Sequence, residues 1–183
     1  LPWIDMADAM REANVPLLSL EGAAPLASFD VVGFHIPHEM ACTNYPEALD
    51  LAGIPLFAKD RDEDDPLIIA GGPSVYNPEP VAAFFDAILI GEGEESLVEV
   101  CRTHQRLRDA GASRIEILRA LALVPGTYVP ALYEECHDGP CTEHGYVVPK
   151  QGEDVPSVVY KRVIADFAAA AARAAKAGFD GIQ

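Results

Sequence analysis

The stretch DPLIIAGGPSVYNPEPVAAFFDAILIGEGEESLVEV, residues 65–100, decides the fold. It contains two short apolar runs, LIIA at 67–70 and AILI at 87–90, and each run leads into glycines. Strands that are apolar at every position are covered on both faces, which is typical of a parallel sheet between layers of helices. We therefore predict two parallel strands, joined by a helix that Pro78, Glu79 and Pro80 open and that extends through Phe85.

The alternation of strand and helix continues on both sides of this stretch. DVVGFHI at 30–36 reads as another buried strand, and LLSL at 17–20 is a shorter strand candidate. Helical spacing and end signals predict helices over residues 2–14, 44–53, about 96–110 and about 113–122. The pattern predicts an α/β fold over residues 1–124, with an open, doubly wound, mostly parallel sheet of the Rossmann or flavodoxin type.

After Pro125 the alternation of strands and helices gives way to short extended segments separated by turns. GTYVPALYEE, the turn HDGP and TEHGYVVP predict a β-hairpin, and VPSVVYKRV at 155–163 is one more extended piece. We assign residues 125–165 to a β-hairpin and linker. Residues 166–183 form the last segment, an alanine-rich helix followed by the start of a strand.

Charge and composition exclude several classes of function. The 183 residues contain 13 lysines and arginines against 29 aspartates and glutamates, which gives a formal net charge of −16. Such a charge argues against binding to nucleic acids and to anionic membranes. No apolar run approaches the roughly 20 residues that span a bilayer. The acidic run KDRDEDD at 59–65 is best interpreted as a solvated loop.

The cysteines are too sparse for a disulfide framework. Cys42, Cys101, Cys136 and Cys141 are spread over a long chain, which favours a reducing, cytoplasmic location. We expect Cys101 to be buried in its helix. A hairpin could bring Cys136 near Cys141, but two incidental thiols are the simpler interpretation.

Candidate binding residues follow from the topology, because open parallel sheets bind ligands at the carboxyl ends of their strands. Glycines there let backbone amides approach a ligand closely, although tight strand-to-helix turns need glycines as well. Glutamates at the second bend favour a hydroxyl, amide or cationic ligand over phosphate. The candidate residues are His35, His38, Gly71, Gly72, Pro73, Ser74, Gly91, Glu92 and Gly93.

A metal site is the alternative for the segment HIPHEMAC at 35–42. Imidazole and thiolate groups could bind zinc, but the spacing matches no common zinc signature. We therefore favour His35 and His38 as residues that line the binding region and change charge near neutral pH. No Ser-His-Asp order, Walker loop or metal-binding helix motif is present, so the residues indicate no catalytic group.

Three segments together resemble a known family. They are DVVGFHIPHEMACTN at 30–44, LDLAGIPLFAKDR at 49–61 and the stretch at 65–100. They resemble the N-terminal, cobalamin-binding-like domain of an uncharacterised family of radical S-adenosylmethionine (SAM) proteins, and the resemblance extends to about residue 165. It implies an accessory domain that positions substrate or cofactor against a catalytic barrel in the same protein. That barrel would carry a [4Fe–4S] cluster and S-adenosylmethionine.

The sequence departs from this superfamily in two motifs. Cys-x-x-x-Cys-x-x-Cys, which binds the cluster, is absent, so we expect this chain to hold no cofactor alone. Asp-x-His-x-x-Gly, which supplies a cobalt ligand in many cobalamin domains, is absent too, so any cobalamin would bind without a histidine ligand from this chain. Both ends of the chain have the character of a cut fragment, and the first strand of the domain would lie upstream.

Two other interpretations stay open. The domain could be a stand-alone corrinoid- or nucleotide-binding module, or a docking module, without catalysis. The tail DFAAAAARAAKAGFDGIQ at 166–183 resembles a segment of an old-yellow-enzyme-type flavin barrel, which a chance match or a chimeric gene would explain. Part of a flavin-dependent reductase is therefore the weaker alternative.

Overall fold

A four-stranded sheet lies at the centre of the protein. The computed structural model describes residues 2–137 and 145–156. The strands are β1 (Val31–His35), β2 (Leu67–Gly71), β3 (Ala87–Leu89) and β4 (Thr127–Tyr128), and they are arranged in this order across the sheet. The first three strands are parallel, and β4 is antiparallel to β3. The predicted open, mostly parallel α/β sheet is confirmed.

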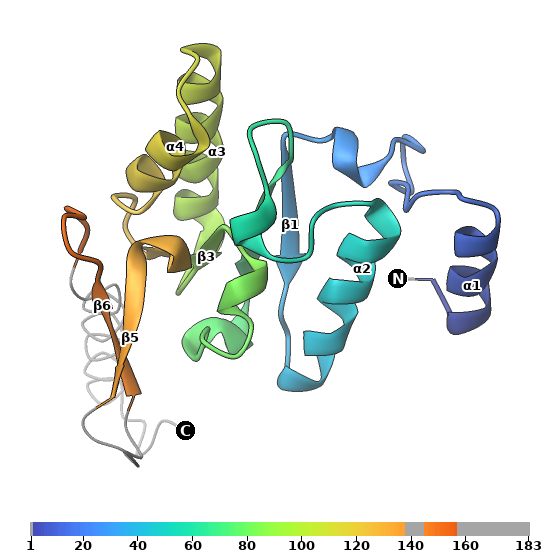
Figure 1. Cartoon of the computed structure of the whole chain (residues 1–183), viewed down its shortest axis with the longest axis horizontal. Helices are drawn as coiled ribbons and strands as arrows, with labels where there is room; N and C mark the ends of the chain where they lie inside the picture. Colours follow the sequence, from blue (N-terminus) through green and yellow to red (C-terminus); the bar gives the residue numbers. More distant parts are fainter. Residues whose placement is uncertain (1, 138–144, 157–183) are drawn as a thin grey trace, which may run out of the picture.

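Helices lie on both sides of this sheet. They are α1 (Ile4–Glu12), α2 (Asn44–Ala52), α3 (Gly93–Asp109) and α4 (Arg114–Leu121). Figure 1 shows α2 beside β1 on one side, with α3 and α4 beyond β3 on the other. No helix in the described part of the chain has the length and apolar character needed to cross a membrane. Short 3-10 turns lie between these helices and strands: Leu26–Ser28, Glu39–Thr43, Ala58–Asp60, Pro73–Tyr76, Ala82–Phe84 and Pro130–Leu132.

The helix ends follow the signals in the sequence. α2 stops at Gly53, whose φ of 69° is left-handed and suits glycine. α4 begins with a capping box, in which the Ser113 side chain accepts a hydrogen bond from the Glu116 N–H and the Glu116 carboxylate accepts one from the Ser113 N–H at 2.8 Å. The Ser113 hydroxyl also donates to this carboxylate at 2.6 Å. α3 begins at Gly93, three residues earlier than predicted.

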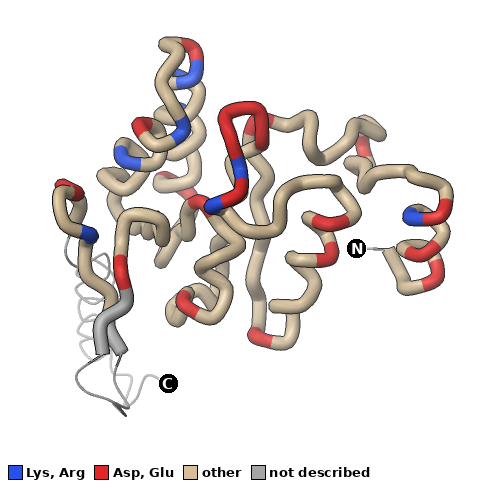
Figure 2. Tube along the Cα trace, viewed as in Figure 1, with Lys and Arg blue, Asp and Glu red and all other residues tan. Residues whose placement is uncertain are grey.

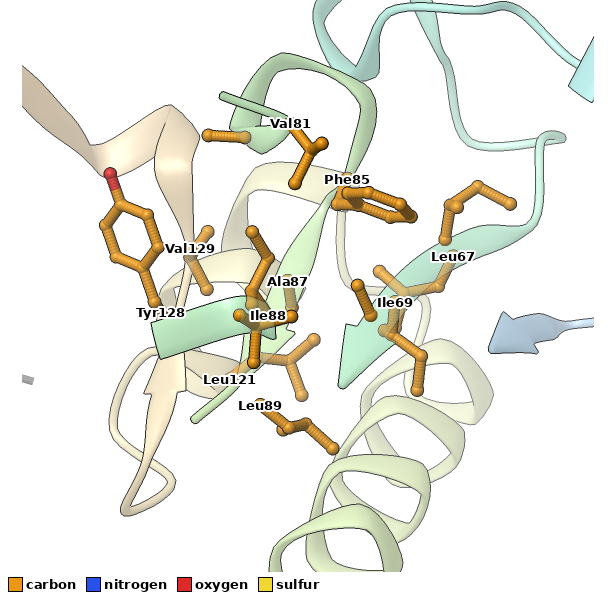
Figure 3. Packing of buried hydrophobic residues seen from close by; sticks show 14 of the residues in the cluster. Leu67, Ile69, Val81, Phe85, Ala87, Ile88, Leu89, Leu121, Tyr128 and Val129 are labelled. Carbon is orange, nitrogen blue, oxygen red and sulfur yellow. The ribbon is translucent and has the colours of Figure 1, made fainter. Parts of the chain in front are cut away.

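The core is built on the two central strands. Residues 67–70 of β2 and all of β3 are buried, as their uninterrupted apolar sequence predicted. Figure 3 shows their side chains packed with Val81 and Phe85 from the connecting segment, Leu121 from α4, and Tyr128 and Val129 from the β4 region. β1 is less covered, and Gly33 and His35 are exposed.

Several local predictions were wrong. Residues 78–85 contain the short 3-10 turn Ala82–Phe84 rather than an α-helix, and the backbone N–H groups of Val81, Ala82, Phe84 and Phe85 donate to carbonyls three residues back instead of four. LLSL at 17–20 contributes one isolated bridge, Leu18 to Pro25, rather than a strand. Cys101 is exposed on α3 rather than buried.

The hairpin after the sheet is confirmed, with β5 (Tyr133–His137) antiparallel to β6 (Gly145–Pro149). Thr127 and Tyr128 precede it and pair with β3 instead. The segment after β6 is tied to the domain, since both Arg119 nitrogens Nε and Nη2 donate to the Glu153 carboxylate at 2.8 Å. Cys141, most of the extended piece at 155–163 and the tail at 166–183 lie outside the described residues.

The acidic run at 59–65 is not entirely solvated, because Arg61 within it is buried. Its guanidinium donates to Asp86 Oδ2 at 3.0 Å and to the carbonyls of Pro55, Leu56 and Phe84 at 2.8–3.0 Å. Burial lowers the pKa of this guanidinium, but arginine stays protonated in proteins. The buried positive charge therefore requires the Asp86 carboxylate.

A second arginine completes this cluster. Arg114 Nη2 lies 2.9 Å from Asp86 Oδ2, and Arg114 also donates to the carbonyls of Asp62, Asp65 and Pro66. The Ile68 N–H donates to the same Asp86 oxygen at 2.8 Å. Asp86 Oδ1 is buried and has no partner among the described residues. One carboxylate oxygen thus joins the loop before β2, β2 itself and the start of α4. We call Arg61, Asp86 and Arg114 the Asp86 cluster.

Asp86→Asn should destabilise the protein by about 3–5 kcal/mol, because it leaves two guanidinium groups near a neutral side chain in a buried site. Urea unfolding followed by circular dichroism measures the loss. Asp30→Asn is the matched control, since the Asp30–Arg108 pair is close (2.7 Å) but its side chains are 75% and 44% exposed. That variant should unfold like the wild type. Equal losses in both variants would contradict the role of the Asp86 cluster.

Acidification should destabilise the protein through His104 on α3. This side chain is buried, and its pKa is lowered by burial and then by Arg108, with a smaller lowering by Arg114, against raising effects of Asp30 and Asp86. As the pH falls through about 6.5, unfolded chains take up a proton that the folded state resists, so stability decreases.

Unfolding free energies of the wild type and His104→Gln, measured from about pH 7.5 to about pH 5.5, check this prediction. The wild type should lose more stability than the variant over this interval. Parallel pH profiles would show that His104 does not titrate differently in the folded state.

Candidate functional site

The carboxyl ends of the parallel strands form one edge of the sheet. The register aligns His35 with Gly71 and Gly71 with Leu89, so β1, β2 and β3 end in one row. β4 runs in the opposite direction, and its first residue, Thr127, pairs with Leu89. Both glycine bends identified in the sequence therefore leave the sheet at this edge. We call it the carboxyl rim and define it by His35, Gly71–Ser74, Gly91–Gly93 and Gly126.

The first bend depends on glycine at position 72. Gly72 has a φ of 118° and a ψ of 177°, a conformation that is essentially limited to glycine. A Cβ atom there would lie 2.7 Å from the Ile36 carbonyl oxygen and 2.9 Å from Nδ1 of His35. The same Ile36 oxygen accepts a hydrogen bond from the Ser74 N–H at 3.2 Å. The structure thus brings His35, Gly71, Gly72 and Ser74 together, with Pro73 exposed between them.

The second bend leads into α3. Gly91 and Glu92 are exposed, and Gly91 has a φ of 104°. Glu92 precedes the first residue of the helix, Gly93, without capping it through its side chain. Glu94 and Glu95 lie in the first turn, where carboxylates interact favourably with the helix dipole. These acidic groups also disfavour a phosphate ligand.

A third glycine, at position 126, was missed by the sequence analysis. Gly126 has a φ of 80°, and its carbonyl accepts a hydrogen bond from the Ile90 N–H at 2.8 Å. A Cβ atom there would lie 3.0 Å from the Ile90 carbonyl oxygen. The Ser96 hydroxyl donates to the neighbouring Pro125 carbonyl at 3.1 Å, which ties α3 to this turn. In the sequence, the pair Pro125-Gly126 before residues 127–129 could have predicted this turn, because Pro-Gly pairs are typical of turns.

The two histidines occupy different places. His35 is exposed at the end of β1, where its carbonyl accepts a hydrogen bond from the Tyr45 hydroxyl at 3.3 Å. His38 is exposed and extended, just before the turn Glu39–Thr43, and no described contact joins it to the glycine bends. The described residues contain no group of three or more His, Cys, Asp or Glu side chains suited to a metal ion.

Buried aliphatic residues flank the bends along the chain: Ile36, Val75, Leu89 and Ile90. No side chain of the rim, as far as the structure describes it, forms a hydrogen-bonded pair of nucleophile and base. Backbone amides, imidazole and carboxylate groups are the polar groups of the rim, and such groups can bind a small polar molecule.

The comparisons with known proteins identify the family. The family model described as "Radical SAM proteins, N-terminal" matches residues 1–130, which is more than half of the chain. This chain therefore belongs to the family of N-terminal domains of radical SAM proteins. No curated protein and no solved structure matches it.

The residues of this domain do not fit the iron–sulfur cluster that radical SAM chemistry requires. The three-cysteine motif is absent from the sequence, and the described residues offer no cluster of metal ligands. Cys42 and Cys101 are free thiols on different helical segments. The match thus supports an accessory domain of a radical SAM protein, and no reaction step is assigned to these residues.

Gly72→Ala should destabilise the protein by about 2–4 kcal/mol, since a methyl group meets a backbone carbonyl and the residue must keep a strained conformation. Thermal unfolding measures the effect. Gly93→Ala is the matched control at the same rim, because nothing lies within 4 Å of a Cβ atom there and its φ is not positive. That variant should melt close to the wild type, and a similar loss in both would contradict the requirement at position 72.

Proposed function

We propose that this accessory domain turns its carboxyl rim toward the catalytic barrel of the same protein and positions a substrate or cofactor there. The family match over residues 1–130 carries the proposal, because it associates the domain with radical SAM proteins. Binding at the carboxyl ends of parallel strands is also the general rule for open α/β sheets.

The difference between the two edges of the sheet supports this orientation. The opposite edge, where β2 and β3 begin, is covered by the loop that Arg61 and Arg114 hold in place. Figure 2 shows that loop as a nearly continuous acidic segment. The carboxyl rim instead leaves Gly91, Glu92 and His35 exposed. The rim is thus the edge at which a ligand or a second domain reaches the backbone of the bends.

The chemistry of the rim favours a particular class of ligand. Glu92 and Glu94 are exposed carboxylates next to the second bend, and His35 offers an imidazole next to the first. Together with the backbone amides, they suit a small molecule with hydroxyl, amide or cationic groups. His38 adds a second imidazole if the segment after β1 closes on the ligand.

The cofactors of the reaction belong elsewhere under this proposal. A [4Fe–4S] cluster and S-adenosylmethionine would be bound by the barrel. Cobalamin is the ligand of the alternative proposal, a stand-alone binding module. Titration of the purified chain with hydroxocobalamin tests the corrinoid-binding alternative: a shift of the visible spectrum with a micromolar dissociation constant favours the module, and an unchanged spectrum leaves a docking role or substrate positioning.

Amide hydrogen exchange tests the orientation of the rim. In a polypeptide that also contains the radical SAM barrel from the same gene, the amides of Gly71, Gly72, Ser74 and residues 91–94 should exchange at least about tenfold more slowly than in this chain alone, because the barrel shields them from water. The loop at 62–65 is the control and should exchange equally in both proteins.

Two results would contradict the proposal. Unchanged exchange at the rim would show that the barrel lies elsewhere. Slowing at residues 62–65 without slowing at the rim would place the barrel against the opposite edge. Glu92→Lys and its matched control Glu63→Lys add a second measurement, since only the first should alter the protection of the rim.

A further inference from the structure

After β6 the chain turns back onto the domain. We call residues 150–156, which follow β6, the strap. The Lys150 N–H donates to the Leu132 carbonyl at 2.9 Å, and the Lys150 ammonium group donates to the Ala131 carbonyl at 2.7 Å. The Glu153 N–H donates back to the Lys150 carbonyl at 3.0 Å. The beginning of the strap is therefore held by carbonyl groups of the turn before β5.

A bidentate ion pair holds the middle of the strap. Arg119 of α4 donates to the two carboxylate oxygens of Glu153 through Nε and Nη2, both at 2.8 Å. Two parallel hydrogen bonds fix the direction of the carboxylate as well as its distance. The Glu153 side chain is only 15% exposed, and Val155 beside it packs against the core. The middle of the strap is thus bound to the helix layer of the domain.

A buried tyrosine holds the end of the strap. The Tyr133 hydroxyl donates to the Pro156 carbonyl at 2.8 Å. Burial raises the pKa of this hydroxyl, so it stays protonated and remains a donor at neutral pH. Tyr133 is the first residue of β5, and its own position is fixed by the pairing of β5 with β6.

The same tyrosine connects the strap to the carboxyl rim. Its ring centroid lies 5.0 Å from that of Tyr128, two residues after Gly126 of the rim. The Tyr128 hydroxyl donates to Glu79 Oε1 at 2.7 Å. Glu79 belongs to the segment that continues from the first glycine bend toward β3. Direct contacts therefore link the end of the strap with two segments that leave the rim.

The position of the strap in the chain gives this arrangement a consequence. The matched family model describes the N-terminal part of radical SAM proteins and covers residues 1–130. Under the proposed function the barrel follows later in the same chain, so the path from the sheet to the barrel passes through the strap. Two domains in one chain move relative to each other unless something restrains them.

We propose that the strap fixes the direction in which the chain leaves this domain and thereby positions the barrel relative to the carboxyl rim. Arg119, Tyr133 and Glu153 are the positioning residues. The identity of the following domain rests on the proposed function, whereas the closure of the strap is tested without it.

Limited proteolysis of this chain tests the closure. Trypsin cleaves after Lys150 when the strap is released, because a protease needs a detached segment. Tyr133→Phe keeps the ring and loses the hydrogen bond to Pro156. Cleavage after Lys150, followed by mass spectrometry, should be at least about threefold faster in this variant than in the wild type. Equal rates would overturn the proposal.

Two controls separate strap release from other effects. Tyr45→Phe is the matched variant, since Tyr45 and Tyr133 are both 5% exposed and both donate to a backbone carbonyl, in Tyr45 that of His35. It should leave cleavage after Lys150 unchanged. Cleavage after Arg102, inside α3, reports unfolding of the whole domain and should stay slow in every variant. Equal acceleration at both sites would reduce the effect to lost stability and overturn the proposal.

A double-mutant cycle with the same readout tests the ion pair. Arg119→Gln and Glu153→Gln should each accelerate cleavage after Lys150. The double variant should be no faster than the faster single variant, because either change already breaks the pair. Accelerations that multiply would show that the two side chains act independently and would overturn their role in the strap.

The positioning is tested in a polypeptide that also contains the barrel from the same gene. Small-angle X-ray scattering should give a larger radius of gyration for Tyr133→Phe/Glu153→Gln than for the wild type, and Tyr45→Phe should match the wild type. Identical scattering of all three proteins would overturn the proposal. Failure of the proposed function has a different sign, namely rim amides that exchange equally with and without the barrel in the wild type.

Discussion

The buried carboxylate of Asp86 is the constraint on which the rest of the structure depends. One of its two oxygens, Oδ2, binds Arg61, Arg114 and the Ile68 amide. These contacts join the loop before β2, the strand β2, the start of β3 and the helix α4. A buried ion pair is often no more stabilising than apolar side chains of the same shape. Its contribution here is to fix one arrangement of the loop before β2, since both guanidinium groups also bind backbone carbonyls of that loop.

This arrangement makes the two edges of the sheet unlike each other. The loop that Arg61 and Arg114 bind lies at the edge where β2 and β3 begin, and the glycine bends lie at the opposite edge, where Gly91 and Glu92 are exposed. At Gly72 a backbone carbonyl and an imidazole ring occupy the space of a side chain, and at Gly126 a carbonyl does so. The carboxyl rim is therefore formed by backbone held in place by its neighbours. This backbone surface is the one to which we assign the positioning role under our proposal.

Sequence reasoning was most accurate where the signals are short-range. The apolar runs of β2 and β3, the stop of α2 at Gly53 and the capping of α4 by Ser113 each depend on a few adjacent residues. It was wrong where a distant partner changes the environment. Arg61 looked solvated because its neighbours are acidic, yet its partner Asp86 is 25 residues away. Thr127 and Tyr128 were assigned to the hairpin because only the sheet shows their pairing with β3.

By itself, the sequence determined the α/β class, the parallel character of the central strands and the positions of the bends at Gly72 and Gly91. Periodicity, capping and the conformational freedom of glycine are properties of neighbouring residues, and they can be read along the chain. Only the tertiary structure decided that β4 runs antiparallel to β3, that Gly126 joins the rim and that a charged cluster is buried beneath the acidic loop. These features depend on strand order and on desolvation by segments far apart in the chain, and no local pattern encodes either of them.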